Sequence, residues 1–152
     1  MTVVVRPLAA SDYSAWSGLW THYNAFYGRS GETALHDDVV ATTWARLLEN
    51  DEPVYGLLAV LDDLPVGLAH FVFHMNLIQI AETCYLQDLF TTPFARGHGV
   101  ARTLLGGVYD DCRKRGVRDV YWHTHEGNSA ARSLYDKVAR NTGFIVYRTN
   151  VD

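Results

Sequence analysis

The sequence predicts one α/β domain, in which a mixed sheet carries helices on both faces. Strand-like apolar runs alternate with segments whose apolar residues recur at the helical spacing. The chain has 152 residues, 48% of them hydrophobic, which is enough for one substantial core and too little for two ordinary domains. A glycine turn over residues 96–101 joins a strand directly to a helix. We therefore expect a single domain over residues 1–152 with the element order βααβββαβαβ.

The first part of the chain is expected to form a strand and two helices. Residues 2–6 are a short β-branched strand that Pro7 ends. Ser11 or Asp12 then caps a helix with an apolar stripe at the 3.6-residue period, namely Trp16, Leu19, Trp20, Tyr23 and Phe26. After a glycine break at residues 28–31, a second helix opens at residues 36–38. The two helices and their loop form a candidate lid.

The rest of the chain completes the sheet. Apolar strands over residues 54–61 and 66–74 read as an antiparallel hairpin, and a third long strand covers residues 80–91. The helix that begins at the glycine turn continues to Gly116, a typical C-terminal stop. A strand over 118–123, a helix over 129–140 and a final strand over 144–148 follow.

Composition limits the partners and the compartment. The formal charge of −4 disfavours nucleic acid, which requires clustered cations, and no run is long enough to span a membrane. The N-terminus lacks a basic leader followed by an apolar stretch, so a cytoplasmic location is expected. Cys84 and Cys112 show no paired spacing and are expected to be buried free thiols.

The turn at residues 96–101, with the sequence Arg-Gly-His-Gly-Val-Ala, is an anion-binding candidate. Free N–H groups and the positive end of the dipole meet at a helix start, and glycine lets a phosphate approach the main chain. A dinucleotide fingerprint would need glycine at Arg102, and a nucleotide-hydrolase loop would need Gly-Lys-Ser or Gly-Lys-Thr. The turn therefore predicts a phosphorylated ligand of another class.

Three blocks in order resemble the GNAT N-acetyltransferases, which bind acetyl-CoA. Arg96-x-x-Gly99-x-Ala101 is similar to the family's pyrophosphate signature. Residues 85–91 resemble the strand before it, and Asn128-x-x-Ala131-x-x-Leu134-Tyr135 resembles a later helix motif. The sequence of the last block is similar to histone- and polyamine-type acetyltransferases, and the earlier block is similar to diamine acetyltransferases. The resemblance to this branch implies a homodimer.

The resemblance implies a set of cofactor-binding residues. Backbone N–H groups of the glycine turn would hold the pyrophosphate, with added charge from Arg96 and Arg102. The family splays two central parallel strands at this point, so the main chain of residues 89–91 would pair with the pantetheine. Asn128 would add a polar contact. The full set is Leu89, Phe90, Thr91, Arg96, Gly97, His98, Gly99, Val100, Ala101, Arg102, Asn128, Ala131 and Tyr135.

Tyr135 is the candidate general acid, because a phenol suits a thiolate leaving group. Related diamine acetyltransferases carry glutamate where this chain has Gln87, and an amide is not a useful base. Proton removal is therefore expected to run through a water, with Asp88 as the candidate catalytic carboxylate; direct attack by the minor neutral form of the amine is the alternative. Further groups could anchor the water or attract the amine, namely Glu82, Glu126, His74 and His123. His123-x-His125 lacks further metal ligands, so no metal is expected.

We expect direct acetyl transfer from acetyl-CoA to a primary amine of a small polyamine-like or amino-acid-like molecule, or of a protein. Neither cysteine has neighbouring His and Asn or Asp residues in the arrangement that activates a nucleophile, so no acyl-enzyme is expected. The alternative is a non-catalytic acyl-CoA sensor or interaction module, which Gln87 permits. A third interpretation is that the turn binds a nucleotide. Acceptor choice is expected to depend on residues 28–36 and on the strand after His70.

Overall fold

The computed structural model describes residues 2–49 and 51–152. The chain forms two compact units, one that ends at Trp122 and one that covers His123–Asp152. The first unit contains the sheet and helices α1, α2 and α3, and the second contains helix α4. Each unit is described by itself below.

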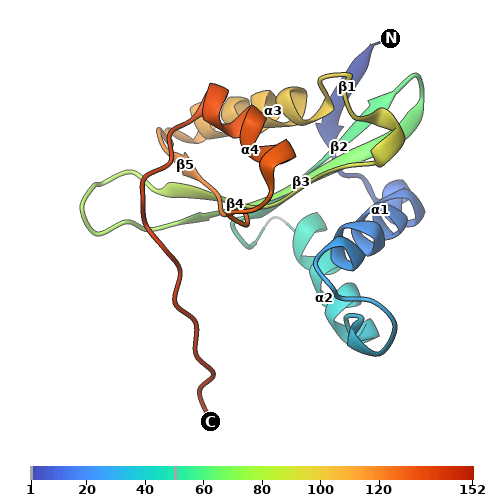
Figure 1. The fold of residues 1–152 in the computed structure, drawn as a ribbon, viewed down its shortest axis with the longest axis horizontal. Coiled ribbons are helices and arrows are strands. Elements are labelled where there is room, and N and C mark those ends of the chain that lie inside the picture. Colours follow the sequence, from blue (N-terminus) through green and yellow to red (C-terminus); the bar gives the residue numbers. More distant parts are fainter. Residues whose placement is uncertain (1, 50) are drawn as a thin grey trace. The chain divides into compact units, whose positions relative to one another are not determined.

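The first unit is built on one five-stranded mixed sheet (Figure 1). Its strands are β1 (Val3–Pro7), β2 (Val54–Leu61), β3 (Leu64–His74), β4 (Thr83–Thr91) and β5 (Val120–Tyr121). They lie side by side in chain order. The first four pair antiparallel, and β5 pairs parallel to β4. The predicted hairpin is the β2–β3 pair, whose two-residue turn places Asp62 and Asp63 at positive φ.

Helices cover both faces of this sheet, as predicted. Helices α1 (Tyr13–Phe26) and α2 (Asp37–Leu48) lie on one side and α3 (Val100–Arg115) on the other (Figure 1). Four residues of the predicted stripe of α1 are buried in one cluster with Leu58 and Leu68 of the sheet, namely Trp16, Leu19, Trp20 and Tyr23, whereas Phe26 at the end of the helix is 59% exposed. A Cβ at Gly107 of α3 would meet Val5 and Leu57, so glycine permits close packing there. Short 3-10 turns precede α1, α2 and α3, at Ala10–Asp12, Gly31–Thr33 and Pro93–Ala95.

The structure departs from the sequence prediction mainly toward the C-terminus. Strand β4 begins at Thr83, β5 contains only two residues, and α4 covers Ser129–Val138. The predicted strand over 144–148 is wrong, because these residues adopt no regular secondary structure. Their apolar side chains are exposed, with Phe144 at 92%. A strand exists only where a neighbour pairs with its backbone, and apolar composition alone does not supply that neighbour.

Candidate active site

Strand β4 carries a β-bulge at Gln87. His70 of β3 lies opposite Asp88, whereas the next residue, Phe71, lies opposite Leu86, so Gln87 has no partner. An extra residue reverses the alternation of side chains along a strand. Consequently Cys84 packs toward α3, while Asp88 contacts α1. The bulge leaves the Gln87 side chain exposed.

Beyond the bulge, β4 has an open edge. Strand β5 pairs only with Cys84 and Tyr85 of β4. The Thr92 N–H donates to Val66 of β3 at 2.8 Å, and antiparallel hydrogen bonds alternate along a strand. The main chain of Phe90 therefore faces β3, whereas Leu89 and Thr91 present their amide groups away from β3. An extended, amide-containing ligand can pair with this edge.

The open edge leads to the predicted phosphate turn. Gly97 and Gly99 adopt φ values of 83° and 77°, a region that favours glycine, and a Cβ added at either would meet no atom within 4 Å. Gly99 caps α3, whose first backbone bond is Thr103 N–H to the Gly99 carbonyl at 3.0 Å. The N–H groups of residues 100–102 precede that bond and have no helical partner. Residues 96–99 are exposed, so the turn is open to an anion.

Two hydroxyls between the edge and the turn are unpartnered. The Oγ1 atoms of Thr91 and Thr92 are buried and have no hydrogen-bond partner within the part of the chain described. Buried hydroxyls are normally hydrogen-bonded. The accessible groups beside them are the main chain of the open edge, which can pair with amides, and the N–H groups of the glycine turn, which suit a diphosphate; together they fit a coenzyme A-type ligand.

A buried polar network lies beneath the bulge, between β3, β4 and α1. His70 Nδ1 and Asp88 Oδ2 are 2.7 Å apart, and Trp20 Nε1 donates to the same oxygen at 3.2 Å. Trp16 Nε1 donates to His70 Nε2 at 2.8 Å. Since an indole N–H can only donate, Nε2 accepts and Nδ1 carries the proton that bonds Asp88. These two bonds fix the orientation of the His70 ring.

This network keeps Asp88 ionised. Burial raises the pKa of Asp88, but the hydrogen bond and charge of His70, with a further hydrogen bond from Trp20, hold that pKa below its ordinary value. Burial and the nearby carboxylate raise the pKa of the Tyr23 phenol well above its usual range. Tyr23 therefore stays neutral, and its hydroxyl donates to the Gln87 carbonyl at 3.4 Å. The bulge lies beside a buried negative charge.

The remaining predicted site residues lie in the second unit. Asn128 caps α4, because its side-chain oxygen accepts from the Ala131 N–H at 3.4 Å. Tyr135 is half-buried on the same helix, one turn after Ala131. The sequence order of these residues is that of the predicted motif. Asn128 thus has a local structural role in addition to the one the sequence predicts.

Two of the alternative proton acceptors lie far from the turn. Glu82 pairs with Arg115 at 2.9 Å, at the C-terminal end of α3. That helix has 16 residues, so its ends are roughly 22 Å apart. His74 contacts the Tyr121 hydroxyl at 2.8 Å and lies opposite Thr83, at the start of β4. Neither residue lies near the glycine turn. His123 and Glu126 belong to the second unit.

The two cysteines are buried free thiols, as predicted. They hydrogen-bond each other between β4 and α3, and burial raises the pKa of both. A thiol kept protonated is a poor nucleophile. Neither cysteine is therefore suited to carry an acyl group.

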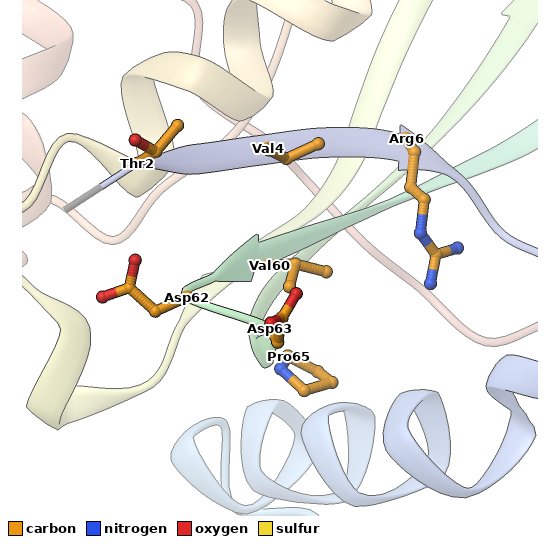
Figure 2. A pocket seen from close by; sticks show the side chains of 7 residues that line it. All are labelled: Thr2, Val4, Arg6, Val60, Asp62, Asp63 and Pro65. Atoms are coloured by element: carbon orange, nitrogen blue, oxygen red, sulfur yellow. The ribbon is translucent and has the colours of Figure 1, made fainter.

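A hollow elsewhere in the first unit is unrelated to these features. It lies over the edge of the sheet formed by β1 and the β2–β3 turn, between Thr2, Arg6, Asp62 and Asp63 (Figure 2). None of the predicted site residues lines it. Within residues 2–49 and 51–152, no group of three or more metal-ligating side chains is found. In the same residues no helix is long and apolar enough to cross a bilayer.

Comparison with known proteins identifies the family. Residues 16–139 match the acetyltransferase (GNAT) family, which covers most of the chain. The chain belongs to the GNAT family. It is accordingly an acyltransferase of the N-acetyltransferase type, and the resemblance found in the sequence is confirmed.

Two curated relatives of this GNAT protein act on amines, by their names. The chain is 33% identical over 150 residues to the D-amino-acid N-acetyltransferase HPA3 of Saccharomyces cerevisiae, covering 97% of this chain and 91% of the relative. It is 26% identical over 106 residues to the thialysine N-epsilon-acetyltransferase of Caenorhabditis elegans, covering 66% and 65%.

A solved structure confirms the GNAT fold. AAC(6')-Iy in complex with the bisubstrate analog CoA-S-monomethyl-acetylneamine superposes with a TM-score of 0.83, covering 100% of both chains. The sequence identity is 17%, so this likeness supports the fold alone.

Sequence reasoning missed two features of the site. The alternation over residues 85–91 reads as an unbroken strand, so it gave no sign of the bulge. His70 was noted only as the start of a region that shapes the acceptor site. A histidine within an otherwise apolar strand, at a distance from any turn, is the signal that indicates a buried polar partner.

Proposed function

We propose that this protein transfers the acetyl group of acetyl-CoA directly to the amine of a small, amino-acid-like molecule. One observation carries the proposal: the open edge of β4 beyond Gln87 runs into a helix start with two left-handed glycines. The amide edge suits pantetheine, and the N–H groups of residues 98–101 suit a diphosphate. The name of the yeast relative supports an amino acid as acceptor.

The chain's own residues have distinct proposed tasks. Arg96 and Arg102, both exposed beside the turn, add charge for the phosphates. Leu89 and Thr91 pair through their main chain, and Asn128 and Ala131 complete the cofactor contacts. Acetyl-CoA supplies the thioester. Positioning along the edge accounts for much of the rate enhancement, since it replaces a bimolecular encounter.

Proton transfers are assigned to two groups. Tyr135 is the proposed general acid for the departing thiolate. Asp88 is buried beneath the bulge, so we assign it the attraction of the cationic amine and the anchoring of a water that takes its proton. Gln87 orients the incoming amine rather than deprotonating it. The protonated thiols of Cys84 and Cys112 support direct transfer without an acyl-enzyme.

The proposal extends to the organisation of the protein. Residues 1–152 act as one N-acetyltransferase domain, because the family match spans both units. The reduced thiols suit a cytoplasmic location. The exposed apolar residues Phe144, Ile145 and Tyr147 supply a surface that a second copy can cover, which supports a homodimer. Analytical ultracentrifugation measures the last point directly.

Calorimetry and acceptor-dependent release of free CoA test the function. The protein is expected to bind acetyl-CoA and to release CoA with at least one of D- and L-amino acids, polyamines or aminoglycosides. Arg96→Ala and Arg102→Ala each weaken cofactor binding by roughly tenfold. Arg118→Ala, another exposed arginine, serves as the matched control and leaves binding unchanged. Absence of binding contradicts the proposal, and binding without release with any amine indicates a sensor.

Tyr135→Phe tests the proton donor. Loss of a general acid lowers kcat by roughly 100-fold while acetyl-CoA binding is retained. Tyr147→Phe removes an exposed hydroxyl from the same unit and leaves kcat unchanged. Equal kcat values for the wild type and Tyr135→Phe would remove Tyr135 from the mechanism.

A further inference from the structure

Arg29 follows helix α1 and is held in one orientation by the end of that helix. Its backbone N–H donates to the Asn24 carbonyl at 2.8 Å, and its Nε donates to Asn24 Oδ1 at 2.7 Å. Asn24 is itself buried, and its Nδ2 donates to the Trp20 carbonyl at 2.9 Å. The guanidinium is therefore fixed through an anchor that belongs to the core.

Two tyrosine rings support the same guanidinium. Arg29 Cζ lies 6.0 Å from the centroid of the Tyr23 ring and 5.6 Å from that of Tyr27. The two rings are 5.0 Å apart. Contacts between a cation and aromatic rings hold the charge without using its N–H donors. Arg29 is half-buried, so the group remains accessible.

The Nη donors of Arg29 form no hydrogen bond or ion pair with residues 2–49 or 51–152. Several other arginines pair with carboxylates, namely Arg6, Arg46, Arg113 and Arg115. Arg29 forms no such pair with the described residues, and only its Nε donates a side-chain hydrogen bond. With Nε occupied, the two Nη groups form a free planar fork. Such a fork is matched by the two oxygens of a carboxylate.

The fork lies close to the proposed reaction centre. The Arg29 guanidinium lies over the Tyr23 ring, and the Tyr23 hydroxyl donates a hydrogen bond to the Gln87 carbonyl at the bulge. The buried Asp88 carboxylate lies beneath the same bulge. The Arg29 guanidinium and the Asp88 carboxylate are thus separated by about the length of one tyrosine side chain. An α-amino acid has the matching charges, since its ammonium nitrogen is two bonds from its carboxyl carbon.

We propose that Arg29 binds the carboxylate of an amino-acid acceptor and thereby directs its amine to the bulge in β4. This inference rests on the function proposed above and deepens it by naming the residue that recognises the acceptor's carboxylate. A diamine presents a second cation to Arg29 instead of an anion, so it is disfavoured by like-charge repulsion. Arg29 is a specificity-determining residue for acceptors that carry a carboxylate.

Paired acceptors test this assignment. Each pair contains an amino acid, in D and L forms, and the amine that lacks its carboxylate: phenylalanine and phenethylamine, leucine and isopentylamine, lysine and cadaverine. The wild type is expected to prefer the amino acid in at least one pair. Arg29→Gln raises KM for that amino acid by roughly 10- to 100-fold and changes KM for its matched amine less than about twofold.

Two further variants separate recognition from folding. Arg29→Lys keeps the charge above the tyrosines but lacks the fork, so its KM increase is smaller than that of Arg29→Gln. Arg46→Gln, at an exposed arginine of α2, leaves both KM values unchanged. Calorimetry with acetyl-CoA checks that each variant retains the cofactor site. If Arg29→Gln fails to fold, Arg29→Lys provides the comparison.

The outcomes distinguish this inference from the proposed function. Acetylation by the wild type with equal KM changes for the amino acid and its amine overturns the role of Arg29 and leaves the function intact. So does a wild-type preference for the carboxylate-free amine in every pair. If the wild type acetylates no amine at all, the proposed function fails and this inference fails with it.

Discussion

The two faces of the sheet are packed by different chemistry. Beneath α1, the core contains a histidine and an aspartate joined to two tryptophans by directional hydrogen bonds. Beneath α3, the buried residues are apolar or thiols, namely Leu104, Leu105, Val108, Cys84 and Cys112. Directional bonds fix angles and protonation states, whereas apolar packing fixes mainly distance and volume. The geometry of the α1 side, where we propose that the acceptor binds, is thus specified more closely than that of the α3 side, which supports the glycine turn.

This difference follows from what each face supports. The α1 face lies under the bulge, where we propose that the acceptor binds. The α3 face holds a helix start near the end of β4, whose backbone N–H groups are the proposed contacts to the cofactor. Variants on the two faces should therefore differ in the ratio of lost activity to lost stability.

Asp88→Asn is expected to have the largest effect. The substitution removes the charge that accepts hydrogen bonds from His70 and Trp20, and it leaves an amide N–H facing donors. Unfolding in urea should show a loss of about 2–4 kcal/mol, and kcat/KM should fall in the remaining folded protein. Asp110→Asn, at an exposed pair on α3, should change stability by less than about 0.5 kcal/mol. Equal losses of stability in Asp88→Asn and Asp110→Asn would contradict a stabilising role for the network.

Trp16→Phe tests one bond of the same network. It leaves His70 Nε2 without its donor and should cost about 1–3 kcal/mol. Trp44→Phe is the matched control, because the ring centroids of Trp44 and Trp16 are 4.8 Å apart and Trp44 makes no hydrogen bond to His70. Thermal unfolding of both variants compares them, and the pH dependence of kcat should change only in Trp16→Phe. A smaller loss for Trp16→Phe than for its control would contradict the role given to the bond.

Acid should weaken the α1 face first. The pKa of folded Asp88 lies below its ordinary value, which is about 3.9 in an unfolded chain. The stabilisation is therefore complete above about pH 4 and declines as the pH falls through the folded pKa, by up to about 1.4 kcal/mol per pH unit. Urea unfolding between pH 2 and 6 should show this slope in the wild type. In Asp88→Asn this slope should be smaller by the contribution of one proton, because the asparagine side chain does not titrate.

Cys112→Ala should have the smallest effect. Loss of a buried sulfur costs about 1 kcal/mol, measured by urea unfolding. The turnover number should stay within about twofold of the wild type, because the protonated thiol takes no part in transfer. Cys84→Ala provides the parallel case on β4. A loss of turnover in either variant would indicate an acyl-enzyme and overturn direct transfer.

Local patterns predicted most of the fold. The periodic stripe on α1, the hairpin between β2 and β3, and the glycines that bound α3 all depend on neighbours in sequence, and the structure agrees with each. The strand over 144–148 failed because a strand depends on a partner from elsewhere in the chain. The apolar sequence Phe-Ile-Val-Tyr satisfies the local rule without that partner.

The site divides along the same line. The open glycine turn at the start of α3 was predicted because its geometry depends on consecutive residues, 96–101. The network could not be predicted, since His70 and Asp88 are 18 residues apart and meet Trp16 only through strand pairing. Asp88 was singled out as a group that anchors a water or attracts the amine. The bulge places its carboxylate on the α1 side of the sheet, beside His70 and Trp20, and no pattern in the sequence marks the bulge.

The bulge also determines how this protein can change through evolution. Gln87 is the one residue of this part of β4 that has no partner on β3. Deleting Gln87 would bring Leu86 next to Asp88 and leave both opposite their present partners, Phe71 and His70, so each interior would keep its polarity. Deleting a paired residue such as Leu89 would instead turn every later residue of β4 to the other side of the sheet. The length of β4 can therefore change at the bulge at a smaller cost than at its paired positions.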